Sequence, residues 1–352
     1  MAVQAPSPGV VRTLQALRGL AALTIVAYHL EGGINQYLPN TSALNLFRWG
    51  NAAVPVFFVL SGFVVALAAH RRPRPALEFL HGRLARLYPT YLVTAGLFIG
   101  SLALLPATVF RDPLPITAQG LLKTLFFEYG QISGYVYVGW VLWYEAWFYV
   151  IFSLVVARFQ RLAHQSWFAL LISAALVVTA LSRASLVSYF LSGIATFLLC
   201  RNPAGRAPSA PTNLALLLGL IANGLATPIA LIASALVGGL DRLENMMRQP
   251  MAEPFPWPAP LQACFRAVQR LGDASFAIYL VQVLTVSASL KLSLRLITSL
   301  LPDRSAASTY LAYWAVALSV GLISTTLAGL LMHRWIEVPC AHALLGMRHG
   351  RR

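Results

Sequence analysis

The sequence predicts an all-α, polytopic membrane protein with about ten transmembrane helices and both termini in the cytoplasm. Hydrophobic residues make up 58% of the 352 residues and charged residues only 11%, whereas soluble domains are about a quarter charged. The apolar residues gather in runs close to the length of about 20 residues that crosses a bilayer. Basic residues are concentrated in alternate loops, as expected of a chain that crosses a membrane repeatedly.

Ten apolar runs define the expected spans. They cover residues 14–32, 51–69, 87–106, 137–157, 166–182, 184–200, 212–226, 227–240, 272–295 and 308–332. We treat 1–352 as a single transmembrane domain that ends in a basic cytoplasmic tail at 333–352. The longest loops are 107–136, expected outside, and 241–270, expected inside. Because the second is rich in proline, we expect an irregular connector there.

The distribution of charge supports this topology and argues against other classes of protein. With the N-terminus inside, 18 of the 26 Lys and Arg lie in cytoplasmic segments, 7 lie outside and Arg18 lies within the first span. This follows the positive-inside rule. The net charge of +15 is typical of nucleic-acid-binding proteins, but these charges lie in short loops between apolar runs, so no nucleic-acid partner is expected. The three scattered cysteines indicate neither a disulfide framework nor a zinc site.

The first span carries two polar residues that are costly in lipid. Arg18 and His29 are eleven residues apart, which in an α-helix is three full turns plus about 20° and a rise of about 16 Å. Both side chains therefore project from one face, at different depths. An ionisable residue within a membrane indicates a functional site by default. The structural alternative is that Arg18 extends to the lipid headgroups and His29 lies at the interface.

A pair of arginines and an isolated carboxylate add to this signal. Arg83 and Arg86 share one helix face at the cytoplasmic end of the third span, where two guanidiniums suit a phosphate-bearing ligand. Ordinary positive-inside arginines are the alternative. Glu145 lies in the aromatic run "GWVLWYEAWFYVIF", which by itself resembles an interfacial belt. We expect Glu145 to reach a depth near that of His29, where a carboxylate can orient an imidazole or raise its basicity.

Two other motifs favour structural roles. Ser61 and Gly62 lie within the second span and are expected to serve helix packing. Asp273 lies at the start of the ninth span, where the expected role of an aspartate is to cap the helix.

Six motifs, in this order along nearly the whole chain, resemble those of the membrane acyltransferase-3 family. These O-acyltransferases modify bacterial exopolysaccharide, O-antigen, Nod factors and some macrolides. The matching residues are Arg18 and His29; Phe57 to Phe63; Arg83, Arg86, Tyr88 and Pro89; Trp143, Glu145, Phe148 and Tyr149; Gly272, Asp273, Ser275, Tyr279 and Leu280; and Glu337 with Pro339.

Two positions depart from the family pattern. Pro55 stands where the family often has aspartate, and Gln282 stands where a second histidine is common. Glutamine cannot act as a general base, so Gln282 is expected to contribute by hydrogen bonding at most. The basic chemistry then rests on His29.

The resemblance implies a bacterial inner-membrane enzyme with an acyl-CoA donor, most often acetyl-CoA, and no metal. The acceptor would be a hydroxyl of a cell-envelope or secreted polysaccharide or glycolipid. Arg83 and Arg86, with Arg18, are expected to hold the CoA phosphates. His29 is expected to act as general base or to carry the acyl group transiently, with Glu145 orienting or stabilising its imidazole.

Two alternatives come from other classes of protein. A transporter or flippase for a polysaccharide intermediate would also need about ten spans and polar groups at mid-membrane, but we find neither an inverted repeat nor a chain of intramembrane carboxylates. A structural partner in an envelope assembly would not need the set of Arg18, His29, Arg83, Arg86 and Glu145. Dependence on CoA separates the enzyme from both. The sequence indicates neither the acceptor nor the oligomeric state.

Overall fold

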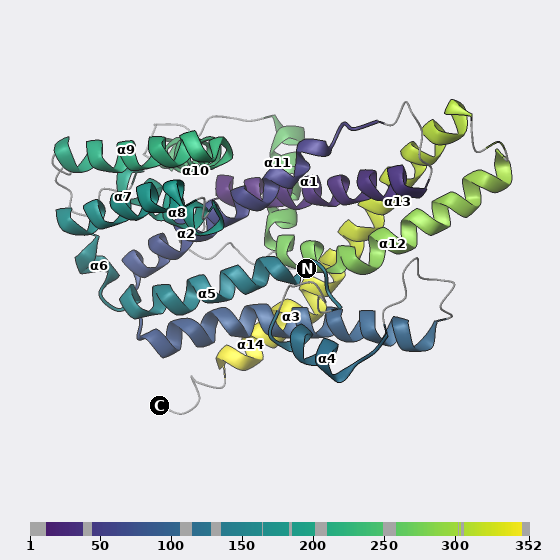
Figure 1. Ribbon diagram of the computed structural model, residues 1–352, viewed down its shortest axis with the longest axis horizontal. Helices are drawn as coiled ribbons and strands as arrows, with labels where there is room; N and C mark the ends of the chain where they lie inside the picture. The colour runs from purple at the N-terminus through teal and green to yellow at the C-terminus, as the bar shows by residue number, and fades with distance from the viewer. Residues whose placement is uncertain are drawn as a thin grey trace. The chain divides into compact units, whose positions relative to one another are not determined.

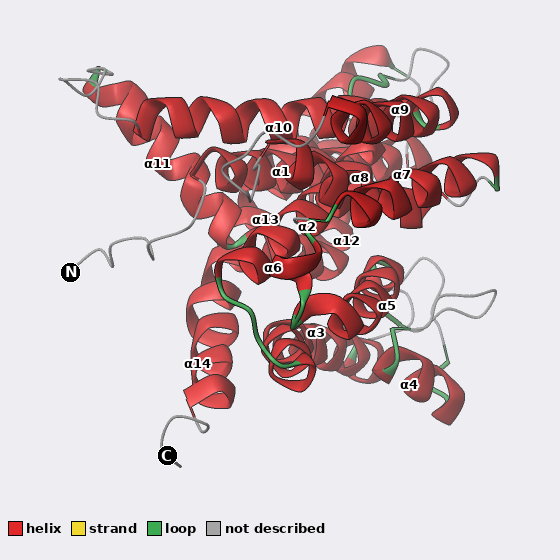
Figure 2. Cartoon of the chain, turned by 90° about the vertical axis from the view of Figure 1, so that its left-hand side faces the viewer, coloured by secondary structure: helices red, strands yellow, loops and turns green. Residues whose placement is uncertain are grey.

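The computed structural model describes residues 12–37, 44–105, 115–127, 135–163, 165–182, 185–200, 210–248, 258–301, 303 and 306–346. Over these residues every regular element is a helix and no strand occurs (Figures 1 and 2). The helices are α1 (Arg12–Tyr37), η1 (Arg48–Ala52), α2 (Ala53–Arg71), α3 (Ala76–Leu104), α4 (Ala118–Leu125), α5 (Gly139–Val156), α6 (Phe159–Leu162), α7 (Ser166–Leu181), α8 (Ser185–Cys200), α9 (Ala210–Ala226), α10 (Pro228–Arg248), α11 (Ala259–Asp273), α12 (Ser275–Leu300), α13 (Ala307–Met332), η3 (His333–Glu337) and α14 (Val338–Gly346).

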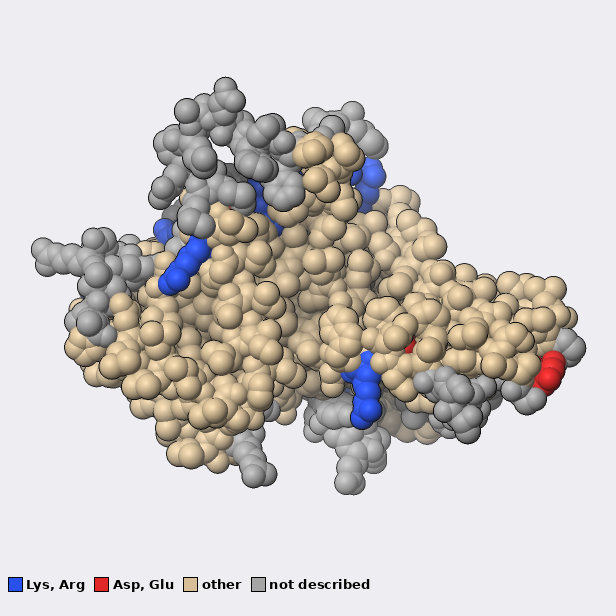
Figure 3. All heavy atoms as spheres, turned by 90° about the horizontal axis from the view of Figure 1, so that it is seen from above, with Lys and Arg blue, Asp and Glu red and all other residues tan. Residues whose placement is uncertain are grey.

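Five of the described helical segments are long and apolar enough to cross a membrane. They are Arg48–Arg71, Ala76–Leu104, Gly139–Val156, Ser275–Leu300 and Ala307–Gly346. Three shorter apolar helices, Ser166–Leu181, Leu186–Cys200 and Pro211–Ala226, fall below this length. On the face shown in Figure 3, the described residues present few Lys, Arg, Asp and Glu side chains, as suits contact with lipid. The all-helical membrane fold is therefore confirmed, while the count of ten spans and the orientation of the termini stay predictions.

The chain divides into two compact units made of interleaved segments. Unit 1 comprises residues 1–21, 54–76 and 151–273, and unit 2 comprises 22–53, 77–150 and 274–352. The helix α1 contributes its first part to unit 1 and the rest to unit 2, whereas α5 begins in unit 2 and ends in unit 1.

In unit 1, small residues let helices approach backbone to backbone. Gly62 of α2 faces the carbonyl of Phe190 on α8, and a Cβ on Gly193 of α8 would lie 2.7 Å from the backbone nitrogen of Phe63. Neither position has room for a side chain. This confirms the packing role predicted for Gly62, while the role of Ser61 stays a prediction. Around the crossing, Phe63 and Phe197 are fully buried with their ring centroids 6.0 Å apart.

In unit 2, α12 and α13 form a closely packed pair. A Cβ on Gly329 of α13 would lie 2.8 Å from the Cα of Ile278 on α12, and the hydroxyls of Thr285 and Thr325 are 2.7 Å apart. The helix α1 packs on the same pair, because Leu30 fills the space left by Gly321 of α13. These contacts place the second part of α1, which carries His29, against α13.

The proline-rich segment 241–270 differs from the prediction. Instead of one irregular connector, its described parts are the end of α10, up to Arg248, and most of α11. Pro260 is the second residue of α11. Proline is tolerated in the first helical turn because the backbone N–H that it lacks has no partner within the helix there. The remaining prolines up to Pro256 lie outside the described residues.

Candidate active site

His29 lies on α1 in unit 2, half-buried and bordered by two tyrosine rings. The centroid of its imidazole is 5.2 Å from that of Tyr28 and 5.4 Å from that of Tyr137, both in edge-to-face arrangements. Such contacts fix the plane of the ring while leaving its nitrogens to other partners. The continuity of α1 from Arg12 to Tyr37 confirms that Arg18 and His29 belong to one helix.

A polar and aromatic cluster joins α3 to α5 in unit 2. The hydroxyl of Tyr149 donates a hydrogen bond to the carboxylate of Glu145, one helical turn earlier. The guanidinium carbon of Arg83 lies 5.4 Å from the Tyr149 ring centroid and 5.3 Å from that of Phe79. Stacking of this kind is favourable for a planar cation, and it holds Arg83 against the helices.

Tyr279 of α12 connects this cluster with the surroundings of His29. Its hydroxyl donates to the carbonyl of Val138 at 3.0 Å, next to Tyr137. It also lies close enough to Tyr137 and Glu145 to interact with both electrostatically. The described contacts therefore place Tyr279 beside the segment that carries Tyr137, whose ring borders His29.

Glu145 lies about one and a half turns into α5. Glu145 comes six residues after Gly139, the first residue of α5, which is about 9 Å along the helix axis. Its described hydrogen bond is to Tyr149. A direct bond between Glu145 and His29 stays a prediction.

The predicted donor-binding arginines fall in both units. Arg83 and Arg86 share α3 in unit 2, with Arg83 half-buried and Arg86 exposed. Arg18 is half-buried on the part of α1 that belongs to unit 1. Within the described part of the chain, no group of three or more His, Cys, Asp or Glu side chains is placed to hold a metal ion.

Gln282, at the position where the family often has histidine, is fully buried on α12. Its amide nitrogen donates to the carbonyl of Tyr279 at 2.8 Å, while its Oε1 has no hydrogen-bond partner among the described residues. The side chain is thus held next to Tyr279, in keeping with a hydrogen-bonding role.

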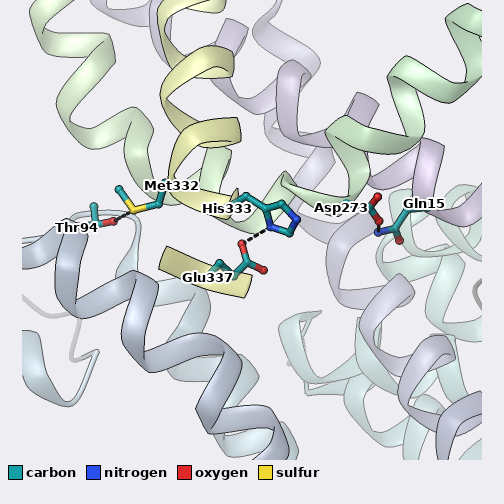
Figure 4. A network of polar contacts seen from close by, with 6 residues as sticks. All are labelled: Gln15, Thr94, Asp273, Met332, His333 and Glu337. Atoms are coloured by element: carbon teal, nitrogen blue, oxygen red, sulfur yellow. Dashed lines mark hydrogen bonds and ion pairs between the residues drawn. The ribbon is translucent and has the colours of Figure 1, made fainter. Parts of the chain in front are cut away.

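Two carboxylates have partners that the sequence did not predict (Figure 4). Asp273 is the last residue of α11 and does not cap α12, whose first turn has no side-chain cap. It accepts a hydrogen bond from Gln15 at 2.6 Å in unit 1. The predicted capping of α12 by Asp273 is therefore wrong. Glu337 is 2.9 Å from Nδ1 of His333 in the π-helical turn η3 of unit 2.

Glu31, two residues after His29, is a further carboxylate that sequence reasoning missed. It is 3% exposed and accepts hydrogen bonds from the backbone of Leu46 at 2.9 Å, the backbone of Phe47 at 2.7 Å and the indole of Trp314 at 3.3 Å. These bonds tie the segment before η1, and α13, to the part of α1 that carries His29. An acidic residue inside the first apolar run was the available signal.

Comparison with known proteins identifies the family of this chain. The model of the acyltransferase domain family matches residues 11–333. The chain is 31% identical over 283 residues to the exopolysaccharide production protein ExoZ of Rhizobium meliloti (strain 1021), which covers 70% of this chain and 80% of that protein. It is 29% identical over an alignment of 397 residues to the acyltransferase MdmB of Streptomyces mycarofaciens, covering 97% and 94% respectively. No solved structure matches.

The family match extends over the first to the last of the predicted spans and includes every predicted site residue. The motifs around His29, Arg83 and Glu145 stand in the same chain as the apolar helices of a membrane protein. The chain belongs to the acyltransferase-3 family, and it is a membrane acyltransferase.

Proposed function

We propose that the protein moves an acyl group, most often acetyl, from acyl-CoA to a hydroxyl of a cell-envelope or secreted polysaccharide or glycolipid. The name of the ExoZ relative, an exopolysaccharide production protein, supports an acceptor of this class. The proposal includes the bacterial inner membrane as the location and a cytoplasmic N-terminus, since the basic residues favour the segments on that side.

The single observation that carries the proposal is the setting of His29. Its imidazole is half-buried on α1 and bordered by the rings of Tyr28 and Tyr137, and Tyr279 bonds to the residue that follows Tyr137. A ring that is fixed in this way suits a general base, which must be oriented before the reaction begins.

In the proposed reaction, His29 takes the proton of the acceptor hydroxyl as its oxygen attacks the thioester carbonyl. The new ester bond forms and the carbon–sulfur bond breaks. The leaving thiolate then takes the proton from the imidazolium, so the products are the ester and free CoA. The negative charge of Glu145 would stabilise the imidazolium, in accord with general electrostatics.

Donor binding is assigned to Arg83 and Arg86. The contact of Arg83 with the rings of Phe79 and Tyr149 supports this role, because it orients the guanidinium before a phosphate arrives. Arg18, on the same helix as His29, is a further candidate for donor binding, and a separate substitution of Arg18 tests it.

The test is ester-linked acetyl in the cell envelope and secreted polysaccharide, released by mild alkali. A strain that lacks the protein is compared with strains that express the native chain or His29→Ala at equal membrane levels. We expect only the native chain to restore the ester. Equal restoration by both would mean that His29 has no chemical role.

A second assay separates the enzyme from a transporter. The purified full chain in lipid nanodiscs is mixed with acetyl-CoA and an envelope polysaccharide extract, and the free thiol of CoA is followed. Release of thiol that depends on the extract and on His29 supports acyl transfer. Absence of release with every acyl-CoA tested would favour a transport role.

A further inference from the structure

The helix α11 is amphipathic, with a different chemistry on each of two opposite faces. At 100° per residue, its apolar side chains fall within one arc of about 120°, and its polar ones within another arc on the far side. The apolar set is Leu261, Cys264, Phe265, Val268 and Leu271, and the polar set is Gln262, Arg266, Gln269, Arg270 and Asp273.

The C-terminal half of α11 packs on the first turns of α1, both within unit 1. A Cβ on Gly19 of α1 would lie 2.7 Å from the carbonyl oxygen of Val268, and Gly272 faces the carbonyl of Gln15. In Figure 1, α11 runs across the direction of α1. The apolar run of the first predicted span begins at Leu14, so α11 crosses α1 near the start of this predicted span.

The N-terminal half of α11 extends beyond this contact with its apolar face uncovered. Leu261 is 49% exposed and Phe265 is 40% exposed, and Cys264 between them is exposed as well. In a membrane protein, such a face at the height where a span begins is suited to the boundary between acyl chains and headgroups.

The opposite face carries two cations. Arg266 and Arg270 are one helical turn apart and both are exposed. Guanidiniums bind phosphate oxygens through paired hydrogen bonds, and basic residues beside a span attract anionic lipids. The apolar face of α11 therefore matches the acyl-chain region of one membrane surface, and its basic face matches the headgroup region.

We propose that α11 is an interfacial helix that binds anionic phospholipid on the side of the membrane where α1 begins. Leu261, Cys264 and Phe265 insert among the acyl chains, and Arg266 and Arg270 bind the phosphate headgroups. Because Gly19 and Gly272 leave no space between the helices, this lipid contact anchors the start of α1, next to Arg18. The proposal does not depend on acyl transfer.

Cys264 provides a direct test of this placement. The full chain with Cys200→Ser and Cys340→Ser is labelled at Cys264 with a small fluorophore and placed in nanodiscs that contain brominated phosphatidylglycerol and phosphatidylcholine. The matched control carries Cys264→Ser and Arg266→Cys, which moves the label to the polar face. We expect brominated acyl chains to quench the label at position 264 at least threefold more than the label at 266. Equal quenching at the two positions would overturn the insertion.

The headgroup contact is tested by charge. The label is at position 264, and the acyl chains are brominated to the same extent in every nanodisc. We expect quenching to fall at least twofold in nanodiscs of phosphatidylcholine alone. We expect the same fall in nanodiscs that contain phosphatidylglycerol when Arg266→Glu and Arg270→Glu are combined. Quenching that is unaffected by both changes would overturn binding to anionic lipid.

A measurement on the native chain avoids dependence on any substitution. A membrane-impermeant maleimide is added to the protein in detergent-free nanodiscs, and modification of Cys264 is followed by mass spectrometry of its peptide. We expect modification at least fivefold slower with phosphatidylglycerol than with phosphatidylcholine alone. Fast modification in both lipids would show that the face stays in water, open to a protein partner instead of lipid.

Discussion

The carboxylate of Glu31 is predicted to hold together the surroundings of His29. In Glu31→Ala, the backbone N–H groups of Leu46 and Phe47 and the indole N–H of Trp314 lose their acceptor. A buried donor without a partner costs about 1–3 kcal/mol.

The net cost is smaller than the sum of three such losses. Leu46 is 57% exposed, so water can reach its part of the segment. Removal of a buried charge also recovers part of its desolvation penalty. We therefore expect the free energy of unfolding to fall by about 2–4 kcal/mol, which lowers the melting temperature by roughly 3–5 °C in a chain of 352 residues.

The assay is thermal unfolding of the purified full chain in one detergent, with Glu31→Gln and Gln119→Ala measured beside Glu31→Ala. The glutamine variant of Glu31 is expected to lie between the native chain and Glu31→Ala, because its amide oxygen can still accept while its NH₂ group faces a donor. Gln119 is exposed and serves as a control, for which a change within about 0.5 kcal/mol is expected. A melting temperature of Glu31→Ala within about 1 °C of the native value would refute the reasoning.

Three further predictions concern the site and the packing beneath it. Arg83→Lys keeps the charge but loses the stacked, planar guanidinium, so KM for acyl-CoA should rise about tenfold with the level of protein unchanged; an unaltered KM would exclude Arg83 from donor binding. Tyr149→Phe removes the donor to Glu145 and should lower kcat about three- to tenfold in thiol-release kinetics while KM for acyl-CoA stays within twofold. Gly193→Val should sharply lower the yield of folded protein on gel filtration, whereas Gly96→Val, where a Cβ meets nothing within 4 Å, should not; equal yields would contradict the close crossing of α2 and α8.

The predictions that succeeded concern local features of the chain. Apolar runs specify membrane helices because the backbone must satisfy its own hydrogen bonds in lipid, and α2, α3, α5, α12 and α13 contain runs of this kind. A glycine within such a run indicates a close approach, as Gly62 confirms. The α11 helix was missed because the density of proline outweighed the amphipathic pattern of Leu261 to Leu271 and concealed that Pro260 stands in a first turn.

The roles of single polar residues were predicted less well, because their partners are far away in the chain. Asp273 was expected to cap the next helix, but its partner is Gln15, 258 residues earlier. Glu31 accepts from Trp314, 283 residues later. Local patterns cannot identify such partners, since helix packing decides which side chains meet.

The sequence by itself determined the membrane-helical class, the acyltransferase-3 family and the candidate residues His29, Arg83 and Glu145, because hydropathy and motif order are properties of the chain. Only the tertiary structure decided that Arg83 stacks on Tyr149, that Tyr149 donates to Glu145, and that Glu31 binds the segment before η1. The reason is physical: the energy of a polar group in a membrane protein depends on the partner that satisfies it, and that partner is set by which helices lie side by side.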